Sequence, residues 1–339
     1  MRFASDPELA ITRLPSGLLA IDVLLKGGFA RGRYTEIFGG YNVGKTAITF
    51  DTIATNQQDG AVCSFVDVEG TFDPEFAYVH GVDLESLALT RQSDLEHGHN
   101  VIDYIEAQLR SGIYDIIVLD SIASLLPKSE WADSIGDASM GTDQARLMSK
   151  ALRKLTAANR KTVLIFINQT RQAVSASAFA KQTVTSGGLA MGFYSGTRLE
   201  VVRIETVKKD GKGIDPKSGN DKKQKKAVGH RLLVRVEKDK TGAAVQTDET
   251  TMVYDYRMGG FDRVEDLLYL GRVHGLIKKN GSRWSLKEYP DDTYNSRGAF
   301  KNFLRADELV AEELEGQILQ AVYAERDDDL TDDEDDDDE

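Results

Sequence analysis

Short apolar runs alternate with longer amphipathic segments over the first half of the chain. Residues 61–67, 115–120 and 162–168 form predominantly apolar runs of strand length. Strands that are apolar on both faces are typical of parallel sheets covered by helices on two sides. Between these runs, residues 95–110 and 143–158 have the period of amphipathic helices. The pattern therefore predicts an α/β fold with a mostly parallel central sheet.

The second half of the chain begins with strands that have no helices between them. Residues 197–207, 229–236 and 250–254 have this character, which predicts an antiparallel extension of the sheet. From about residue 262 a helical segment, a short hairpin region and further helices follow. We expect four parts: a short N-terminal segment (1–14), a core (15–260), a small C-terminal α+β domain (261–326) and a disordered acidic tail (327–339).

The composition is that of a globular protein, with 41% hydrophobic residues among 339. A single cysteine, Cys63, excludes an intramolecular disulfide framework and favours a reducing compartment. The first residues contain no apolar signal segment, and no apolar run reaches the roughly 20 residues that span a membrane. We therefore expect a cytoplasmic protein with no membrane partner.

The net charge of −13 is concentrated at the C-terminus. Residues 327–339 hold 11 acidic side chains, and without them 42 basic residues stand against 44 acidic ones. A block of like charges repels itself and stays disordered. Two interpretations remain open. The tail is a solubility device, or it competes with an anionic ligand for a basic surface elsewhere on the protein.

A lysine-rich segment at 208–226 supplies a candidate for that surface. It carries eight lysines against three aspartates, together with glycine, proline, serine and asparagine. Such a composition cannot bury apolar area, so an exposed loop is expected. Its lysines are either solvated or in contact with a phosphate backbone.

A phosphate-binding motif lies near the start of the core. Gly39, four further residues and then Gly44-Lys45-Thr46 have the P-loop spacing, between a strand-like and a helix-like segment. Glycines allow a tight turn with inward N–H groups, and the following helix adds its positive end. Lys45 would contact the β- and γ-phosphates and Thr46 would bind Mg²⁺. The motif predicts a nucleoside triphosphate site.

Three strand ends supply polar side chains beside this motif. Asp120 ends an apolar strand, where open α/β sheets bind ligands, and is expected to hold magnesium. Glu69 ends a second strand and is the candidate that positions or deprotonates the attacking water; a surface glutamate is the alternative. Gln169 ends a third strand, where it could hydrogen-bond a γ-phosphate oxygen and release it on hydrolysis.

Seven motifs together resemble one family. GGYNVGKT, FVDVEGTFDPEFA, DIIVLDSIASLLPKSE, IGDASMG, LRKL, FINQTR and TSGGLAMGFY occur in this order. The series resembles the bacterial RecA recombinase family, from about Pro15 to the start of the acidic tail. The resemblance implies an ATPase that uses ATP and Mg²⁺ and forms helical filaments on single-stranded DNA. Such filaments pair that strand with homologous double-stranded DNA and exchange strands, in recombination and repair.

The resemblance also implies roles for individual residues. Glu69 matches the catalytic glutamate, and Gln169 matches the residue that couples the γ-phosphate to DNA binding. Lys238 and Lys240 match two lysines that reach the ATP of the neighbouring subunit, like an arginine finger in trans. The implied magnesium ligands are Thr46 and Asp120. The implied nucleotide contacts are Gly39, Gly40, Tyr41, Asn42, Val43, Gly44, Lys45, Thr46, Ala47, Asp73 and Phe76.

For DNA, the resemblance implies two loops and a set of contacts. The loops match residues 131–141 and 170–186, and Phe193 matches a residue at the subunit interface. The implied DNA contacts are Arg146, Arg153, Arg171, Ser186, Gly187 and Gly188.

Several features depart from the family pattern. Only about ten residues precede the motif ITRLPSG, fewer than the family's N-terminal docking helix and strand require. We expect the subunit interface to be built differently, or filament stability to depend more on DNA. Phe76 stands where the family usually has tyrosine, Gly192 where it has lysine, and the 208–226 segment is longer than usual. These differences indicate a divergent member of the family. Its source would be either a bacterium or a phage.

Two other classes of protein share part of this pattern. A RecA-fold motor such as a ring helicase has the P-loop and the strand-end aspartate, but it does not predict EKDK, IGDASMG and TSGG together. A filament protein that binds ATP without hydrolysing it does not require Lys45, Glu69 and Asp120 together. ATPase measurements with and without single-stranded DNA would distinguish these alternatives.

Overall fold

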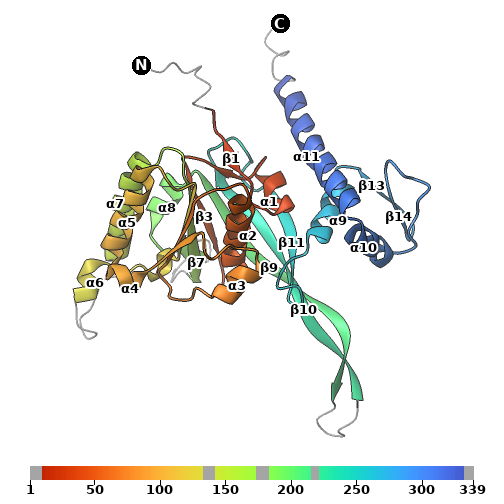
Figure 1. The fold of residues 1–339 in the computed structure, drawn as a ribbon, viewed down its shortest axis with the longest axis horizontal. Helices are drawn as coiled ribbons and strands as arrows, with labels where there is room; N and C mark the ends of the chain where they lie inside the picture. The colour runs from red at the N-terminus through yellow and green to blue at the C-terminus, as the bar shows by residue number, and fades with distance from the viewer. Residues whose placement is uncertain (1–9, 133–141, 173–182, 215–220, 332–339) are drawn as a thin grey trace, which may run out of the picture.

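A ten-stranded sheet forms the centre of the protein (Figure 1). The computed structural model describes residues 10–132, 142–172, 183–214 and 221–331. The strands of the sheet are β3 (Tyr34–Gly39), β4 (Cys63–Asp67), β5 (Leu87–Arg91), β6 (Ile116–Asp120), β7 (Val163–Gln172), β8 (Thr183–Thr185), β9 (Thr197–Ile214), β10 (Asp221–Asp239), β11 (Glu249–Asp255) and β12 (Gly260–Phe261). Their order is β12-β11-β10-β9-β3-β7-β6-β4-β5, and β8 pairs with β7 outside this path.

The sheet has a parallel half and an antiparallel half. In the run β9-β3-β7-β6-β4-β5, each strand is parallel to the next. From β9 outward, the pairs with β10, β11 and β12 are antiparallel. The predicted α/β class and the antiparallel extension are therefore confirmed.

Helices cover both faces of the parallel half. They are α2 (Lys45–Gln58) and α3 (Pro74–Val79) on one face, and α5 (Gly98–Ser111) and α7 (Thr142–Ala158) on the other. In β6, Ile116 and Val118 join the core cluster that contains α2. Ile117 and Leu119 join the cluster that contains α5 and α7. Because alternate residues of a strand point to opposite faces, a doubly covered strand must be apolar throughout.

Short elements complete the core. They are β1 (Arg13–Leu14), α1 (Leu19–Leu24), β2 (Phe29–Ala30), α4 (Gln92–Leu95), the 3₁₀ turn η2 (Ile122–Ser124), α6 (Lys128–Ala132) and α8 (Leu189–Tyr194). In the described ranges, no helix is both long and apolar enough to cross a membrane.

The C-terminal elements pack beside the antiparallel half (Figure 1). They are α9 (Arg263–Val273), β13 (Ile277–Asn280), β14 (Arg283–Leu286), α10 (Arg297–Ala306) and α11 (Glu308–Thr331). Trp284 is buried and stacks on Phe300 with ring centroids 6.2 Å apart. These side chains belong to the same core cluster as Leu19 and Ile21 of α1, so the C-terminal unit shares its apolar core with the body around the central sheet.

The lysine-rich segment is not the loop that its composition predicted. Residues 208–214 continue β9 and residues 221–226 belong to β10, and the two runs pair with each other. The prediction was wrong because it treated burial as a requirement for strand structure. A two-stranded ribbon satisfies its backbone groups by pairing and can leave its side chains in solvent.

Two further boundaries differ from the prediction. Strand β7 continues past Gln169 to Gln172, where it pairs with β8, so part of the expected 170–186 loop is strand. Helix α11 extends to Thr331, five residues into the segment predicted as a disordered tail. Helices often continue beyond the last residue of an apolar pattern, because intrahelical hydrogen bonds need no buried face. The segments 133–141, 173–182 and 332–339, on which other predictions fall, lie outside the described residues.

Candidate active site

The loop between β3 and α2 is shaped by glycine. A Cβ on Gly39 would lie 2.1 Å from the carbonyl oxygen of Val201, so no larger residue fits beside β9. Gly44 has φ 91°, in the left-handed region that favours glycine, and it directly precedes the first turn of α2. The unpaired N–H groups of this helix end therefore face the cavity described below, where they favour an anion.

Lys45 is the first residue of α2, and its side chain folds back onto the preceding loop. Its Nζ donates to the carbonyl oxygens of Gly40 at 2.6 Å and Gly39 at 3.2 Å. Burial lowers the pKa of Lys45, while Asp120 and Glu69 act in the opposite direction. A partly desolvated ammonium group attracts a phosphate more strongly than a hydrated one, because less water screens the charges.

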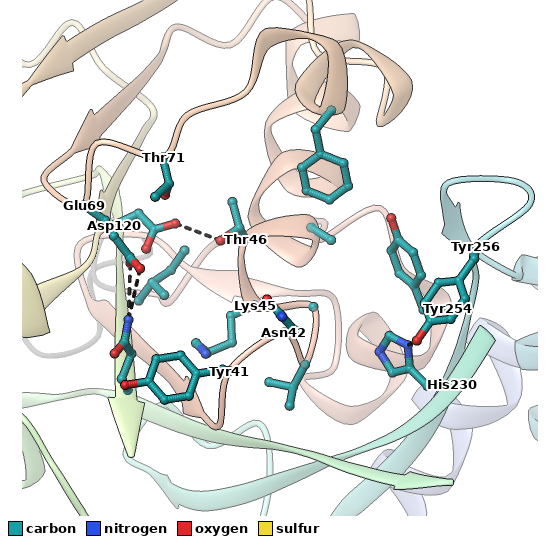
Figure 2. Close-up of a pocket in the computed structure, with 16 residues that line it drawn as sticks. Tyr41, Asn42, Lys45, Thr46, Glu69, Thr71, Asp120, His230, Tyr254 and Tyr256 are labelled. Atoms are coloured by element: carbon teal, nitrogen blue, oxygen red, sulfur yellow. Dashed lines mark hydrogen bonds between the residues drawn. The ribbon is translucent and has the colours of Figure 1, made fainter. Parts of the chain in front are cut away.

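Thr46 and Asp120 form a pair of oxygen donors. Thr46 Oγ1 donates to Asp120 Oδ2 at 2.8 Å, as Figure 2 shows. Burial raises the pKa of Asp120 to about 6; the Thr46 hydrogen bond opposes this shift and Glu69 adds to it. Mg²⁺ prefers oxygen ligands and is commonly held by one or two carboxylates together with water and substrate phosphates. The described residues contain no group of three or more His, Cys, Asp or Glu side chains that could hold a metal alone. This donor pair fits a magnesium ion shared with phosphate oxygens.

Glu69 and Gln169 meet at the edge of the cavity. Glu69 follows β4 and Gln169 lies in β7, and these two strands are the neighbours of β6. Gln169 Nε2 is 3.3 Å from each carboxylate oxygen of Glu69 (Figure 2). The N–H groups of Val68 and Glu69 donate to the carbonyl oxygen of Asp120 at 2.6 and 3.1 Å. The glutamate is therefore fixed to the same strand end as the magnesium-type pair. The three strand-end predictions converge on one place.

Asp67 is a positioning residue that the sequence analysis missed. Its buried carboxylate accepts the backbone N–H groups of Gly70, Thr71 and Phe72 at 2.7, 3.2 and 3.0 Å. These bonds hold the turn that carries Glu69. An aspartate at a strand end with glycine three residues later is a signal for such a turn, because the side chain mimics a backbone acceptor.

The two residues assigned to the adenine base differ in their placement. Phe76 lines the cavity and packs edge-on against Phe50 at 5.7 Å between ring centroids. Asp73 is not among the described residues that line it. Its Oδ1 instead accepts the N–H groups of Glu75 and Phe76 and caps α3. The cap orients the helix that presents Phe76.

The cavity has a volume of about 390 Å³. The sixteen lining residues include residues 41–47 of the P-loop segment, though not Gly39 or Gly40, together with the strand ends and an aromatic wall of His230, Tyr254 and Tyr256. In Figure 2 this wall stands across the cavity from Glu69 and Asp120. His230 stacks on Tyr254, 5.5 Å between centroids, and its Nδ1 lies 3.1 Å from the Tyr256 hydroxyl. The wall was not predicted. It depends on the register of β10 against β11, and no motif marks it.

Lys238 and Lys240 lie outside the set of described residues that line this cavity. Lys238 Nζ donates to the carbonyl oxygens of Gly192 at 2.5 Å and Phe193 at 3.1 Å. Burial, followed by the nearby charges of Lys240 and Arg198, lowers the pKa of Lys238 to about 8. Phe193 is 72% exposed. We call Lys238, Lys240 and Phe193 the lysine surface.

A buried polar network connects the cavity side to the predicted DNA segment. Asn168 Nδ2 donates to Glu36 Oε1 at 2.7 Å and to the Ser186 carbonyl oxygen at 2.9 Å. The other oxygen of Glu36 accepts from Arg198 Nε at 2.5 Å. Gly187 and Gly188 follow with φ of 86° and 69°, a conformation that suits glycine. These residues thus have a structural role in the turn before α8.

Two of the predicted basic contacts lie on α7, and the third, Arg171, lies in β7. Arg146 and Arg153 are both exposed on this helix; Arg146 pairs with Asp143 at 3.3 Å and Arg153 donates to the Ser149 carbonyl oxygen at 3.2 Å. The side chain of Arg171 lies outside the described ones. The DNA-binding assignments therefore stay predictions.

Fold and cavity together define a class. The strand order brings Glu69 and Asp120 to adjacent strand ends beside a P-loop, with an antiparallel extension beyond β9, as in RecA-type P-loop ATPases. The model of the RecA N-terminal domain matches residues 1–259. Over 321 residues, 94% of this chain, Protein RecA of Frankia alni is 38% identical with 86% of its own length covered. Protein RecA of Leifsonia xyli subsp. xyli is also 38% identical, with 83% covered. The chain belongs to the RecA family.

Membership of this family makes the chain an ATP-dependent DNA recombinase with a role in DNA recombination and repair. The ring-helicase alternative is not favoured by either comparison.

Proposed function

We propose that the chain hydrolyses ATP with Mg²⁺ in this cavity and uses the cycle to control a filament on single-stranded DNA. The observation that carries the proposal is the convergence of Lys45, Thr46, Asp120 and Glu69 on one cavity that opens at the N-terminal end of α2. A triphosphate needs backbone N–H donors, a cation and a magnesium site, and these residues supply all three.

Each side chain has a distinct task in this proposal. Glu69 orients the attacking water and accepts its proton, because its carboxylate lines the cavity and forms no ion pair among the described side chains. Thr46 and Asp120 would hold a magnesium ion, and that ion would neutralise charge on the phosphate oxygens. Lys45 releases the loop carbonyls and contacts the phosphates. Gln169 exchanges its bond to Glu69 for one to the γ-phosphate.

Hydrolysis is proposed to require a second subunit. Lys238 and Lys240 lie off the cavity, and α8 exposes Leu189 and Phe193, which are 83% and 72% accessible. Exposed apolar side chains beside cations are suited to contact with another subunit. We propose that this surface docks on the neighbouring nucleotide, so that two lysines complete its charge balance. Repetition of such a head-to-tail contact produces a helical filament.

The filament is proposed to pair its single strand with homologous duplex DNA and exchange strands. Arg146, Arg153, Arg171 and the 186–188 turn are the proposed contacts to the bound backbone. Sequence would be read by base pairing, since cationic side chains contact phosphates without regard to sequence.

Parallel assays test the function. ATP turnover is measured with and without single-stranded DNA, and strand exchange is followed with a labelled homologous duplex. We expect turnover that depends on single-stranded DNA, and exchange that needs homology and ATP. Translocating duplex unwinding without exchange would instead indicate a helicase, and ATP binding without any turnover would contradict an enzymatic role.

A further inference from the structure

The paired part of the lysine-rich segment forms an arm. We call residues 208–214 and 221–227 the basic ribbon. They pair from Lys208 with Ala227 to Ile214 with Asp221, beyond the last contact of β10 with β11 at Gly229. Seven residues on each strand at a rise of about 3.3 Å give a length of about 23 Å. Figure 1 shows the ribbon projecting away from the body.

The root of the arm is anchored. A register shift between Ala227 and Gly229 marks a bulge, which bends and twists a ribbon at a defined point. A Cβ on Gly229 would lie 2.3 Å from the carbonyl oxygen of Tyr254, so the strands approach closely there. The Tyr256 N–H donates to the Val228 carbonyl oxygen at 2.9 Å. The arm therefore leaves the sheet in a fixed direction next to the aromatic wall of the nucleotide cavity.

The charge of the arm is strongly one-sided. The ribbon contains seven lysines and two aspartates, in a chain whose net charge is −13. Lys209 stands opposite Lys226 in the register, and Lys212 opposite Lys223. Like charges directly opposite on a ribbon destabilise it, and an isolated two-stranded ribbon is marginal in water.

Where side chains are described, no ion pair offsets this charge; Lys209 helps to lower the pKa of Asp255, but that carboxylate is already paired with Arg257. Lys208, Lys209, Lys225 and Lys226 are exposed, and none forms an ion pair with a described carboxylate. Asp210 is opposite Lys225 in the register but does not come within ion-pair distance of it. An external polyanion would remove the repulsion and stabilise the ribbon.

We propose that the basic ribbon is a binding arm for the phosphate backbone of double-stranded DNA. A duplex carries one negative charge per about 1.7 Å, hence about 14 phosphates along the length of the arm. Its major groove admits a two-stranded β-ribbon. Residues 208–227 contain no aromatic side chain, so the arm lacks the stacking platforms that single-strand binders use. The inference rests on the proposed function and assigns a site to its duplex partner.

Two matched variants test the arm. In one, four lysines become glutamine, which removes charge but keeps side-chain reach; in the other, the same four become arginine, which keeps the charge. The four are Lys208, Lys209, Lys225 and Lys226. Duplex affinity is measured by fluorescence anisotropy between 50 and 200 mM salt, and thermal unfolding checks the fold.

The glutamine variant is expected to bind duplex at least about tenfold more weakly at low salt. The slope of log K against log salt should fall by up to about 3.6, or roughly 0.9 for each lost contact. The arginine variant should keep the affinity of the unchanged protein. If the arm instead held the chain's own acidic tail, the glutamine variant would bind duplex as tightly as before or more tightly, which would overturn the proposal.

A shortened ribbon provides a second test. Lys209 and Lys226 are opposite in the register, so Asn-Gly can join them in place of residues 210–225 as a two-residue hairpin turn. This variant should also lose duplex affinity, and full retention would overturn the arm. ATP turnover on single-stranded DNA separates the two proposals. Its absence in the unchanged protein contradicts the proposed function, whereas normal turnover with undiminished duplex binding in both variants overturns the arm alone.

Discussion

The nucleotide cavity and the lysine surface lie on the same sheet but are built differently. In the cavity, the two carboxylates meet side chains of the same chain: Thr46 bonds Asp120, and Gln169 bonds Glu69. On the lysine surface, Lys238 donates to backbone carbonyl oxygens, beside an exposed Phe193. The first region has the groups for binding ATP. The second presents two further cations, in addition to Lys45 of the cavity.

This difference separates two steps of the proposed cycle. One chain should bind ATP·Mg²⁺, but turnover should need a second chain that brings Lys238 and Lys240 to the phosphates. Changes in the cavity should then act on each subunit alone, and changes on the lysine surface should act only between subunits.

Glu69→Gln is expected to have the largest effect on turnover. The amide keeps the size of the side chain and can still bond Gln169, but it cannot accept a proton from water. ATP turnover with single-stranded DNA should fall by about 10²- to 10⁴-fold, the usual contribution of a general base. ATP affinity and filament formation, measured by a fluorescent nucleotide and by electron microscopy, should persist. Turnover close to that of the unchanged protein would remove Glu69 from this role.

Lys238→Ala and Lys240→Ala test the other region. Each should reduce turnover by at least about tenfold in assembled protein, because a cation beside the transferred phosphoryl group is lost. Neither should weaken ATP binding to the isolated subunit. A tenfold loss of that affinity would show that these lysines act within their own chain.

Mixing provides the control for action in trans. A Lys45→Ala subunit cannot hold phosphates but keeps the lysine surface, whereas a Lys238→Ala subunit keeps the cavity. Mixed filaments should contain interfaces with both intact halves and recover part of the turnover. No recovery at any mixing ratio would leave the trans arrangement without support.

A pH profile sharpens the same comparison. Burial and neighbouring cations lower the pKa of Lys238 to about 8, so the side chain is charged below that pH and neutral above it. A phosphate nearby would raise this pKa, so loss of activity should begin at or above pH 8. Turnover should fall by up to about fivefold between pH 8 and 9. Lys238→Arg stays charged and should flatten this limb, while ATP binding to the isolated subunit should be level in both proteins.

The residues of the cavity could largely be predicted because short stretches of sequence mark them. Each of Asp120, Glu69 and Gln169 follows or ends an apolar strand, and parallel strands end at one edge of a sheet. The P-loop spacing identifies that edge. The pairing partners of antiparallel strands carry no comparable signal, so His230, Tyr254 and Tyr256 were found only from the register of β10 and β11.

The basic ribbon is a region whose structure the sequence analysis predicted wrongly. Its lysines and glycines argue against a strand by propensity, yet β9 and β10 extend through it because backbone pairing continues from an anchored root. Propensity describes a half-buried strand and says little about a ribbon with both faces in water. The same reasoning failed for α11, whose acidic sequence predicted a disordered tail and which is helical to Thr331.

The smallest expected effect belongs to the acidic tail, and it concerns neither region directly. The 11 carboxylates of residues 327–339 are tethered to a body of nearly balanced charge that carries the basic ribbon. A tethered polyanion is present at high effective concentration, so it can occupy lysines that duplex phosphates would otherwise neutralise. The screening length is about 8 Å at physiological ionic strength, so this competition requires contact.

Truncation after residue 326 should tighten duplex binding by about two- to fivefold at low salt, an effect that shrinks as salt rises. It should also lower the Mg²⁺ concentration needed for strand exchange.

Because α11 reaches Thr331, a second variant that replaces the 11 carboxylates by amides controls for loss of the helix end. Turnover on saturating single-stranded DNA should change little, since the part of this segment that the structure describes, residues 327–331, does not line the cavity. Equal duplex affinity with and without the charges would leave the tail as a solubility device. A gain that vanishes when the four ribbon lysines are also glutamine would identify the ribbon as the site of competition.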